Sequence, residues 1–161
     1  MAFQETQKMD ALWIKVLIIF NSVLTLVIVG KEMIEQPDTT LIATFISLLV
    51  FMVALYFFVV ESKATTRIDT QGIHYKYPPF IMNWKLVGWT DIERVEIKSV
   101  SPLTDFGGWG YRFNRKGKGI ILSGDKAIIA YLKSGKKFTI TTKAPEAAQR
   151  EIDRNSTEKI E

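Results

Sequence analysis

Residues 41–60 read LIATFISLLVFMVALYFFVV, 20 consecutive residues without a charge, a proline or a glycine. A helix rises about 1.5 Å per residue, so this stretch would be roughly 30 Å long, the thickness of a bilayer's hydrocarbon core. Buried helices of soluble proteins are seldom so long and so uniformly apolar. The stretch therefore predicts a membrane-spanning helix.

A second apolar stretch, residues 12–30, precedes the first and contains Lys15 and Asn21. Lys15 lies near its start, where the long side chain can reach the lipid headgroups. We expect Asn21 to face the partner helix, where its amide finds a hydrogen bond. The alternative is a cleaved signal peptide, but the side chains before the stretch carry no net positive charge, and no small-x-small cleavage site follows. Two spans, about 12–30 and 41–60, thus predict a transmembrane helical hairpin over residues 1–60.

The remaining residues, 61–161, are soluble in character and hold 18 Lys and Arg against 12 Asp and Glu. The connecting loop, residues 31–40, has one lysine and three acids. Basic residues near span ends favour the cytoplasmic side. We therefore expect both termini to be cytoplasmic in a multi-pass protein of the plasma membrane. The basic residues of 61–161 would then face an anionic membrane surface.

The composition excludes several classes of site. The chain has no cysteine and one histidine, His74. A disulfide scaffold, a thiolate metal site, a cysteine nucleophile and a multi-histidine metal site are therefore excluded. Asp105-Phe106-Gly107 matches the metal-binding tripeptide of kinases, but the catalytic-loop motif is absent. No arrangement of nucleophile and base is visible, so the sequence predicts no enzyme and no cofactor.

Residues 61–161 alternate apolar and polar side chains in short segments separated by turn residues, which predicts about seven β-strands. A helix is expected to begin at Pro145, followed by Glu146 in its first turn. No helical pattern lies between the strands, so parallel βαβ units are excluded and a small antiparallel barrel or sandwich is expected. Eight segments show this pattern, from which about seven strands are expected: 63–69, 73–77, 80–87, 92–98, 109–114, 119–122, 127–132 and 138–142.

Several short motifs of this half of the chain are distinctive. They are Gly72-Ile73, Trp89-Thr90-Asp91-Ile92, Ser101-Pro102-Leu103, Gly107-Gly108-Trp109-Gly110-Tyr111-Arg112 and Thr141-Thr142-Lys143-Ala144-Pro145-Glu146. With the two apolar stretches, they are similar to those of bacterial two-helix membrane proteins with a pleckstrin-homology-like domain. The resemblance covers nearly the whole chain. It implies an α+β membrane protein in which a seven-stranded antiparallel barrel or sandwich is capped by a C-terminal helix, and it implies no function, because the fold serves many partners.

Two groups of residues are candidate sites. The first is a set of cations that could contact an anion or lipid: Lys63, Arg67, Arg112, Arg115, Lys116 and Lys118. Clustered cations attract lipid headgroups or acidic partners, although a solvated hairpin tip has the same composition. The second is the loop of Gly107, Gly108, Trp109 and Gly110, which is either a structural corner or a binding loop.

The leading hypothesis is an interaction or scaffold module at the cytoplasmic face of the inner membrane that binds protein partners or associates with itself. The first alternative is binding of anionic lipid headgroups through the basic loop. The second is a membrane enzyme of unknown chemistry. Nucleic acid is not expected as a partner: the aromatic segment 108–113 resembles an RNA-binding strand, but the two helices that such a domain needs are absent.

Overall fold

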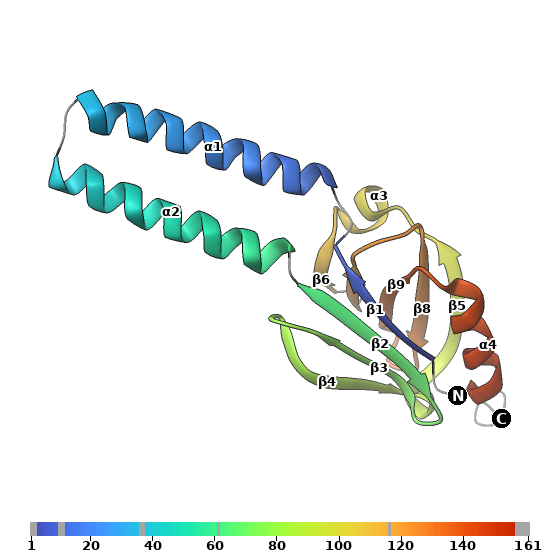
Figure 1. Ribbon diagram of the computed structural model, residues 1–161. Coiled ribbons are helices and arrows are strands. Elements are labelled where there is room, and N and C mark those ends of the chain that lie inside the picture. The colour runs from blue at the N-terminus through green and yellow to red at the C-terminus, as the bar shows by residue number, and fades with distance from the viewer. Residues whose placement is uncertain (1–2, 10–11, 36–37, 61, 116, 157–161) are drawn as a thin grey trace. The chain divides into compact units, whose positions relative to one another are not determined.

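The computed structural model describes residues 3–9, 12–35, 38–60, 62–115 and 117–156 (Figure 1). In these described residues, two long helices follow a first strand, and eight further strands and two shorter helices come after them. In chain order the elements are β1 (Phe3–Lys8), α1 (Leu12–Glu35), α2 (Thr39–Val60), β2 (Lys63–Asp69), β3 (Gly72–Tyr77), β4 (Ile81–Gly88), a 3-10 turn (Trp89–Asp91), β5 (Ile92–Ser99), α3 (Pro102–Phe106), β6 (Gly110–Asn114), β7 (Gly117–Ile121), β8 (Lys126–Leu132), β9 (Lys137–Thr142) and α4 (Pro145–Ser156).

The chain divides into two units, which we call the helical hairpin (residues 11–61) and the β unit (residues 1–10 and 62–161). In the hairpin, α1 and α2 lie antiparallel to each other (Figure 1). The segments Lys15–Glu35 and Thr39–Phe58 are long and apolar enough to cross a membrane. The structure thus contains both of the predicted helices.

Polar side chains of the hairpin hydrogen-bond to the backbone of their own helix. Asn21 is exposed and donates from Nδ2 to the carbonyl of Leu17 at 3.0 Å, so our expectation that it faces the partner helix is wrong. Thr25, Thr44 and Ser47 each donate to the carbonyl four residues earlier at 2.8 Å. Such bonds satisfy hydroxyl and amide groups without water, as an apolar solvent requires.

The β unit contains two sheets with the strand orders β1-β2-β3-β4 and β5-β8-β9-β7-β6. The predicted seven-stranded antiparallel barrel therefore needs correction. The described residues form nine strands, the two sheets do not close into one barrel, and β7 pairs with β9 in parallel. The parallel pair needs no crossover helix, because β8 returns the chain and is antiparallel to β9.

Strand β1 is the main element that the sequence analysis missed. It pairs with β2 along its whole length, from Phe3 opposite Ile68 to Lys8 opposite Lys63. Residues 1–60 are therefore not a hairpin alone, since the first ten belong to the β unit. The hairpin is an insertion between two paired strands, and both connections to it leave from the same end of the β1–β2 ladder.

Alternating residues of β1 face the interior. Phe3 packs against the core, and the buried Gln7 donates from Nε2 to the carbonyl of Thr141. The side-chain amide oxygen Oε1 of Gln7 accepts hydrogen bonds from the hydroxyls of Ser123 at 3.0 Å and Thr141 at 3.1 Å. Glu5 accepts from the Thr142 hydroxyl at 2.6 Å. These contacts join β1 to the second sheet.

Isoleucines from both sheets fill the core, among them Ile68, Ile73 and Ile140. Tyr75 of β3 stacks on Phe138 of β9 with ring centroids 4.4 Å apart, which joins the sheets across the interior. Helix α4 buries Ala148 and Ile152, one turn apart, and contacts strands of both sheets. It begins with Pro145 and Glu146, as the sequence predicts.

Candidate functional site

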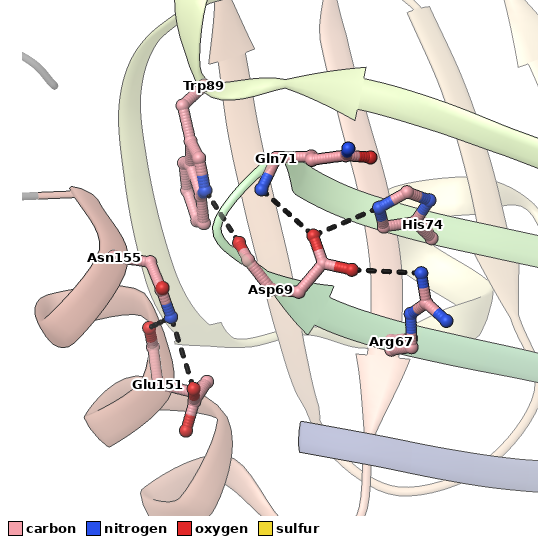
Figure 2. Close-up of polar contacts among 7 residues, drawn as sticks. All are labelled: Arg67, Asp69, Gln71, His74, Trp89, Glu151 and Asn155. Atoms are coloured by element: carbon pink, nitrogen blue, oxygen red, sulfur yellow. Dashed lines mark hydrogen bonds and ion pairs between the residues drawn. The ribbon is translucent and has the colours of Figure 1, made fainter. Parts of the chain in front are cut away.

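A polar network lies on the outer face of the first sheet, where β2 turns into β3 (Figure 2). The carboxylate of Asp69 accepts a hydrogen bond from the Gln71 backbone N–H at 2.9 Å and lies 3.0 Å from Nε2 of His74. Its other oxygen is 2.9 Å from the guanidinium of Arg67. The Asp69 carbonyl accepts from the indole N–H of Trp89 at 2.8 Å, so the turn is held from both sides.

The electrostatics of this network favour the ionised carboxylate. Burial alone would raise the pKa of Asp69, but the hydrogen bonds from Gln71 and His74 and the charges of His74 and Arg67 outweigh it, and the pKa is lowered. Nearby on α4, Asn155 donates to the carbonyl of Glu151 at 2.7 Å, a contact within the helix (Figure 2). Among the described residues no three His, Asp or Glu side chains gather closely enough to hold a metal ion.

The same face carries aromatic, apolar and basic side chains, and we call it the Trp84 face. Its residues are Arg67, His74, Lys76, Met82, Trp84 and Leu86. The Lys76 ammonium lies 4.8 Å from the centre of the Trp84 ring, and the Arg67 guanidinium lies 5.7 Å from it. His74 meets the ring edge to face at 6.5 Å. Cations at these distances are attracted to the indole ring, so the face combines positive charge with apolar surface.

Strand β4 forms the border of this face and of its sheet. In the described part of the chain it pairs only with β3, so its other side presents backbone N–H and C=O groups without a strand partner. Met82, Trp84 and Leu86 alternate along the strand and are 69%, 42% and 49% exposed. A row of large exposed apolar side chains on a free sheet edge is typical of an interaction surface.

The structure separates the six predicted cations. Arg67 belongs to the Trp84 face, and Lys63 lies at the start of β2, opposite Lys8. Arg112 donates from its guanidinium to the carbonyls of Gly108 at 3.3 Å and Gly107 at 3.4 Å, so it fixes a loop. Arg115 and Lys118 remain together near the β6–β7 turn. Lys116 lies outside the described residues.

The glycine loop closes α3. Gly107 has φ +68° and donates its N–H to the carbonyl of Leu103, and Gly108 donates to Pro102 at 2.7 Å. This pair of bonds is the usual way in which a glycine ends a helix. Trp109 is half-buried, and Gly110 begins β6. The geometry supplies a structural reason for Gly107 and Gly108.

A hollow of about 480 Å³ lies beside the β6–β7 turn. We call it the basic hollow: Phe113, Arg115, Gly117, Lys118 and Lys136 line it. Sequence analysis missed Lys136, which comes from the β8–β9 turn. The sequence feature that could have pointed to Lys136 is the basic run Lys133-Ser134-Gly135-Lys136-Lys137. Only the parallel pairing of β7 with β9 brings this run beside Lys118.

Comparison with known proteins gives no relative from which a function could be carried over. No protein-family model, no curated protein and no solved structure matches the chain. The resemblance to proteins with a pleckstrin-homology-like domain is therefore an inference from the residues, and the functional argument depends on the surfaces described above.

Proposed function

We propose that this protein is a membrane-anchored interaction module, and that the free edge of β4 binds an extended, acidic segment of a partner protein. The observation that carries the proposal is the exposed alternation of Met82, Trp84 and Leu86 on a strand with an unpaired side. An added strand would gain main-chain hydrogen bonds along β4, and alternate side chains would pack on the exposed row.

The charges beside β4 select the chemistry of the partner. Arg67 and Lys76 flank Trp84, and Lys85 is exposed on β4 itself. The one carboxylate of the network, Asp69, already pairs with Arg67 and His74. A segment with Asp or Glu between its apolar residues would complement this surface and be steered toward it.

The membrane part of the proposal is supported by the hairpin and by β1. Each long helix has the length and hydropathy of a membrane span. Because β1 and β2 pair, the segments on either side of the hairpin must lie in the same compartment. The residues after the hairpin, 61–161, hold 18 Lys and Arg against 12 Asp and Glu, which favours the cytoplasmic side of the plasma membrane. Within this proposal the pleckstrin-homology-like likeness remains an interpretation, and no catalytic role is assigned.

Photo-crosslinking of the full chain in living bacterial cells tests the proposal. A photoreactive residue is placed at Met82, and in a control chain at Glu93, an exposed position on β5. We expect the residue at 82 to link to an acidic segment of another protein, Trp84→Ser to abolish the link, and the residue at 93 to give none. Links to phospholipid alone, or to β4 of a second copy, would contradict a partner-binding role for this strand.

A further inference from the structure

The basic hollow carries an inference that is independent of the β4 edge. Arg115 and Lys118 come from the end of the β6–β7 hairpin, and Lys136 comes from the β8–β9 turn. Among the described residues no carboxylate lines the hollow, and none of them forms an ion pair with any of the three cations. Cations held close together without a counter-charge repel one another, and a bound anion relieves that repulsion.

The fold forces these cations together. Gly117 has φ +145°, and a Cβ atom there would overlap the backbone carbonyl oxygen of Lys137. The absence of a side chain lets β7 lie against β9 in parallel register, with Gly117 opposite Lys137 and Lys118 opposite Phe138. The two hairpin ends are therefore adjacent because of backbone pairing and not through flexible side chains alone.

One aromatic side chain, Phe113, lines the hollow beside the three cations. Phe113 is 74% exposed and shares its side of the hairpin with Lys118, which is opposite it in the register. A neighbouring cavity of about 270 Å³ shares Gly117, Lys118 and Lys136, and it continues between the sheets to Tyr75 and Phe138. Both volumes are close to or within the range of small-molecule sites, which combine apolar walls with a few charged groups.

We propose that the basic hollow binds a phosphate group attached to an apolar or aromatic moiety. A phosphate dianion matches several cations better than a carboxylate does, and arginine binds it through two parallel hydrogen bonds while lysine acts as a point charge. Phe113 and the cavity toward Tyr75 would hold the apolar part. The phosphate belongs either to a membrane lipid headgroup or to a soluble phosphate ester, and both present the same chemistry.

The test uses the full chain in phosphatidylcholine nanodiscs and two phosphate monoesters. Phenyl phosphate is added from solution in one arm, and phosphatidic acid is included in the nanodisc in the other. The reactivity of each lysine toward an amine reagent is measured by mass spectrometry. We expect protection of Lys118 and Lys136 in at least one arm, with Lys126 and Lys133 unchanged. Protection only by phenyl phosphate identifies a soluble ligand, and protection only by phosphatidic acid identifies a lipid headgroup.

Paired variants separate a site from general positive charge. Lys118→Gln with Lys136→Gln removes two cations of the hollow, and Arg150→Gln with Arg154→Gln removes two exposed cations of α4. Calorimetry measures the affinity for phenyl phosphate, or for short-chain phosphatidic acid if only the lipid arm is positive. The first pair should bind the ligand at least about tenfold more weakly than the natural chain, and the second pair should bind it with unchanged affinity. Absence of protection in both arms, or equal loss in both pairs, would overturn the proposal.

Discussion

The helical hairpin and the β unit are both rich in apolar side chains, but the β unit buries them and the hairpin exposes them. In the β unit Ile68, Ile73 and Ile140 are at most 1% exposed, whereas Phe20 and Val50 of the hairpin are 65% and 62% exposed. The β unit satisfies its hydrophobicity inside its own core. The hairpin presents its apolar side chains outward and pairs its polar side chains with its own backbone, so it is suited to an apolar solvent.

The way the two units are connected lets each keep its own character. The hairpin is inserted between β1 and β2, which are paired residue by residue. The insertion leaves the ladder of the β unit intact, and the hairpin returns the chain to where it left. We regard the pairing of β1 with β2, on either side of the inserted hairpin, as the central feature of this fold.

The largest effect is expected for a charged substitution in the helical hairpin. Val50→Asp places a carboxylate in the middle of α2, which costs about 2.5–3.5 kcal/mol in a membrane-spanning helix. We expect the variant chain to be lost from the carbonate-resistant membrane fraction, whereas Val50→Leu stays there. An unchanged membrane fraction for Val50→Asp would show that α2 does not lie in lipid.

Truncation of an apolar side chain to alanine should have very different effects on stability in the two units. Ile140→Ala removes buried atoms and should lower the free energy of unfolding of the β unit by about 2–5 kcal/mol. Val50→Ala should leave that free energy unchanged, because Val50 belongs to the hairpin and is exposed. Urea denaturation of the full chain in detergent, followed by tryptophan fluorescence, to which the buried Trp89 contributes, measures both. Equal losses would mean that the two units share one core.

A smaller effect is expected at β1. Gln7→Leu leaves the carbonyl of Thr141 and the hydroxyl of Ser123 without their partner, and it should destabilise the β unit by about 1–3 kcal/mol. Gln4→Leu, on the exposed face of the same strand, should change stability by less than about 0.5 kcal/mol. The same denaturation experiment applies. If Gln7→Leu were as mild as Gln4→Leu, β1 would not be joined to the second sheet.

The smallest effect is a dependence on pH. The folded-state pKa of Asp69 lies below its ordinary value of 3.8, so its contribution is present above that value and is lost as pH falls through the lowered pKa. Between about pH 5 and about pH 3, Asp69→Asn should lose less stability than the natural chain, by about 1 kcal/mol or less. Asp125→Asn, at an exposed turn, is the matched control and should lose as much as the natural chain.

Local patterns were enough to predict most elements. The apolar runs identified α1 and α2, alternation identified the strands from β2 onward, and Pro145 marked the start of α4. Strand β1 was missed because FQETQK is mostly polar. Its inward polar residues, the half-buried Glu5 and the buried Gln7, hydrogen-bond to distant residues, among them Thr141 and Thr142.

The candidate sites were predicted less well, for the same reason. The cluster around Arg115 was visible as a run of cations, but Arg112 bonds to loop carbonyls and Lys136 joins from another hairpin. The Trp84 face was not predicted, because alternation along β4 shows which residues share a side and not whether that side is covered. Long-range strand pairing decides both points.

One measurement tests the insertion of the hairpin between paired strands most directly. The hydroxyl oxygens of Thr6 on β1 and Thr65 on β2 are 3.2 Å apart, and the chain has no cysteine of its own. In the Thr6→Cys, Thr65→Cys variant, mild oxidation of the membrane-reconstituted chain should form an intramolecular disulfide, seen by mass spectrometry as a peptide pair linking positions 6 and 65. Free thiols after oxidation, or a disulfide between two chains only, would contradict the pairing of β1 with β2.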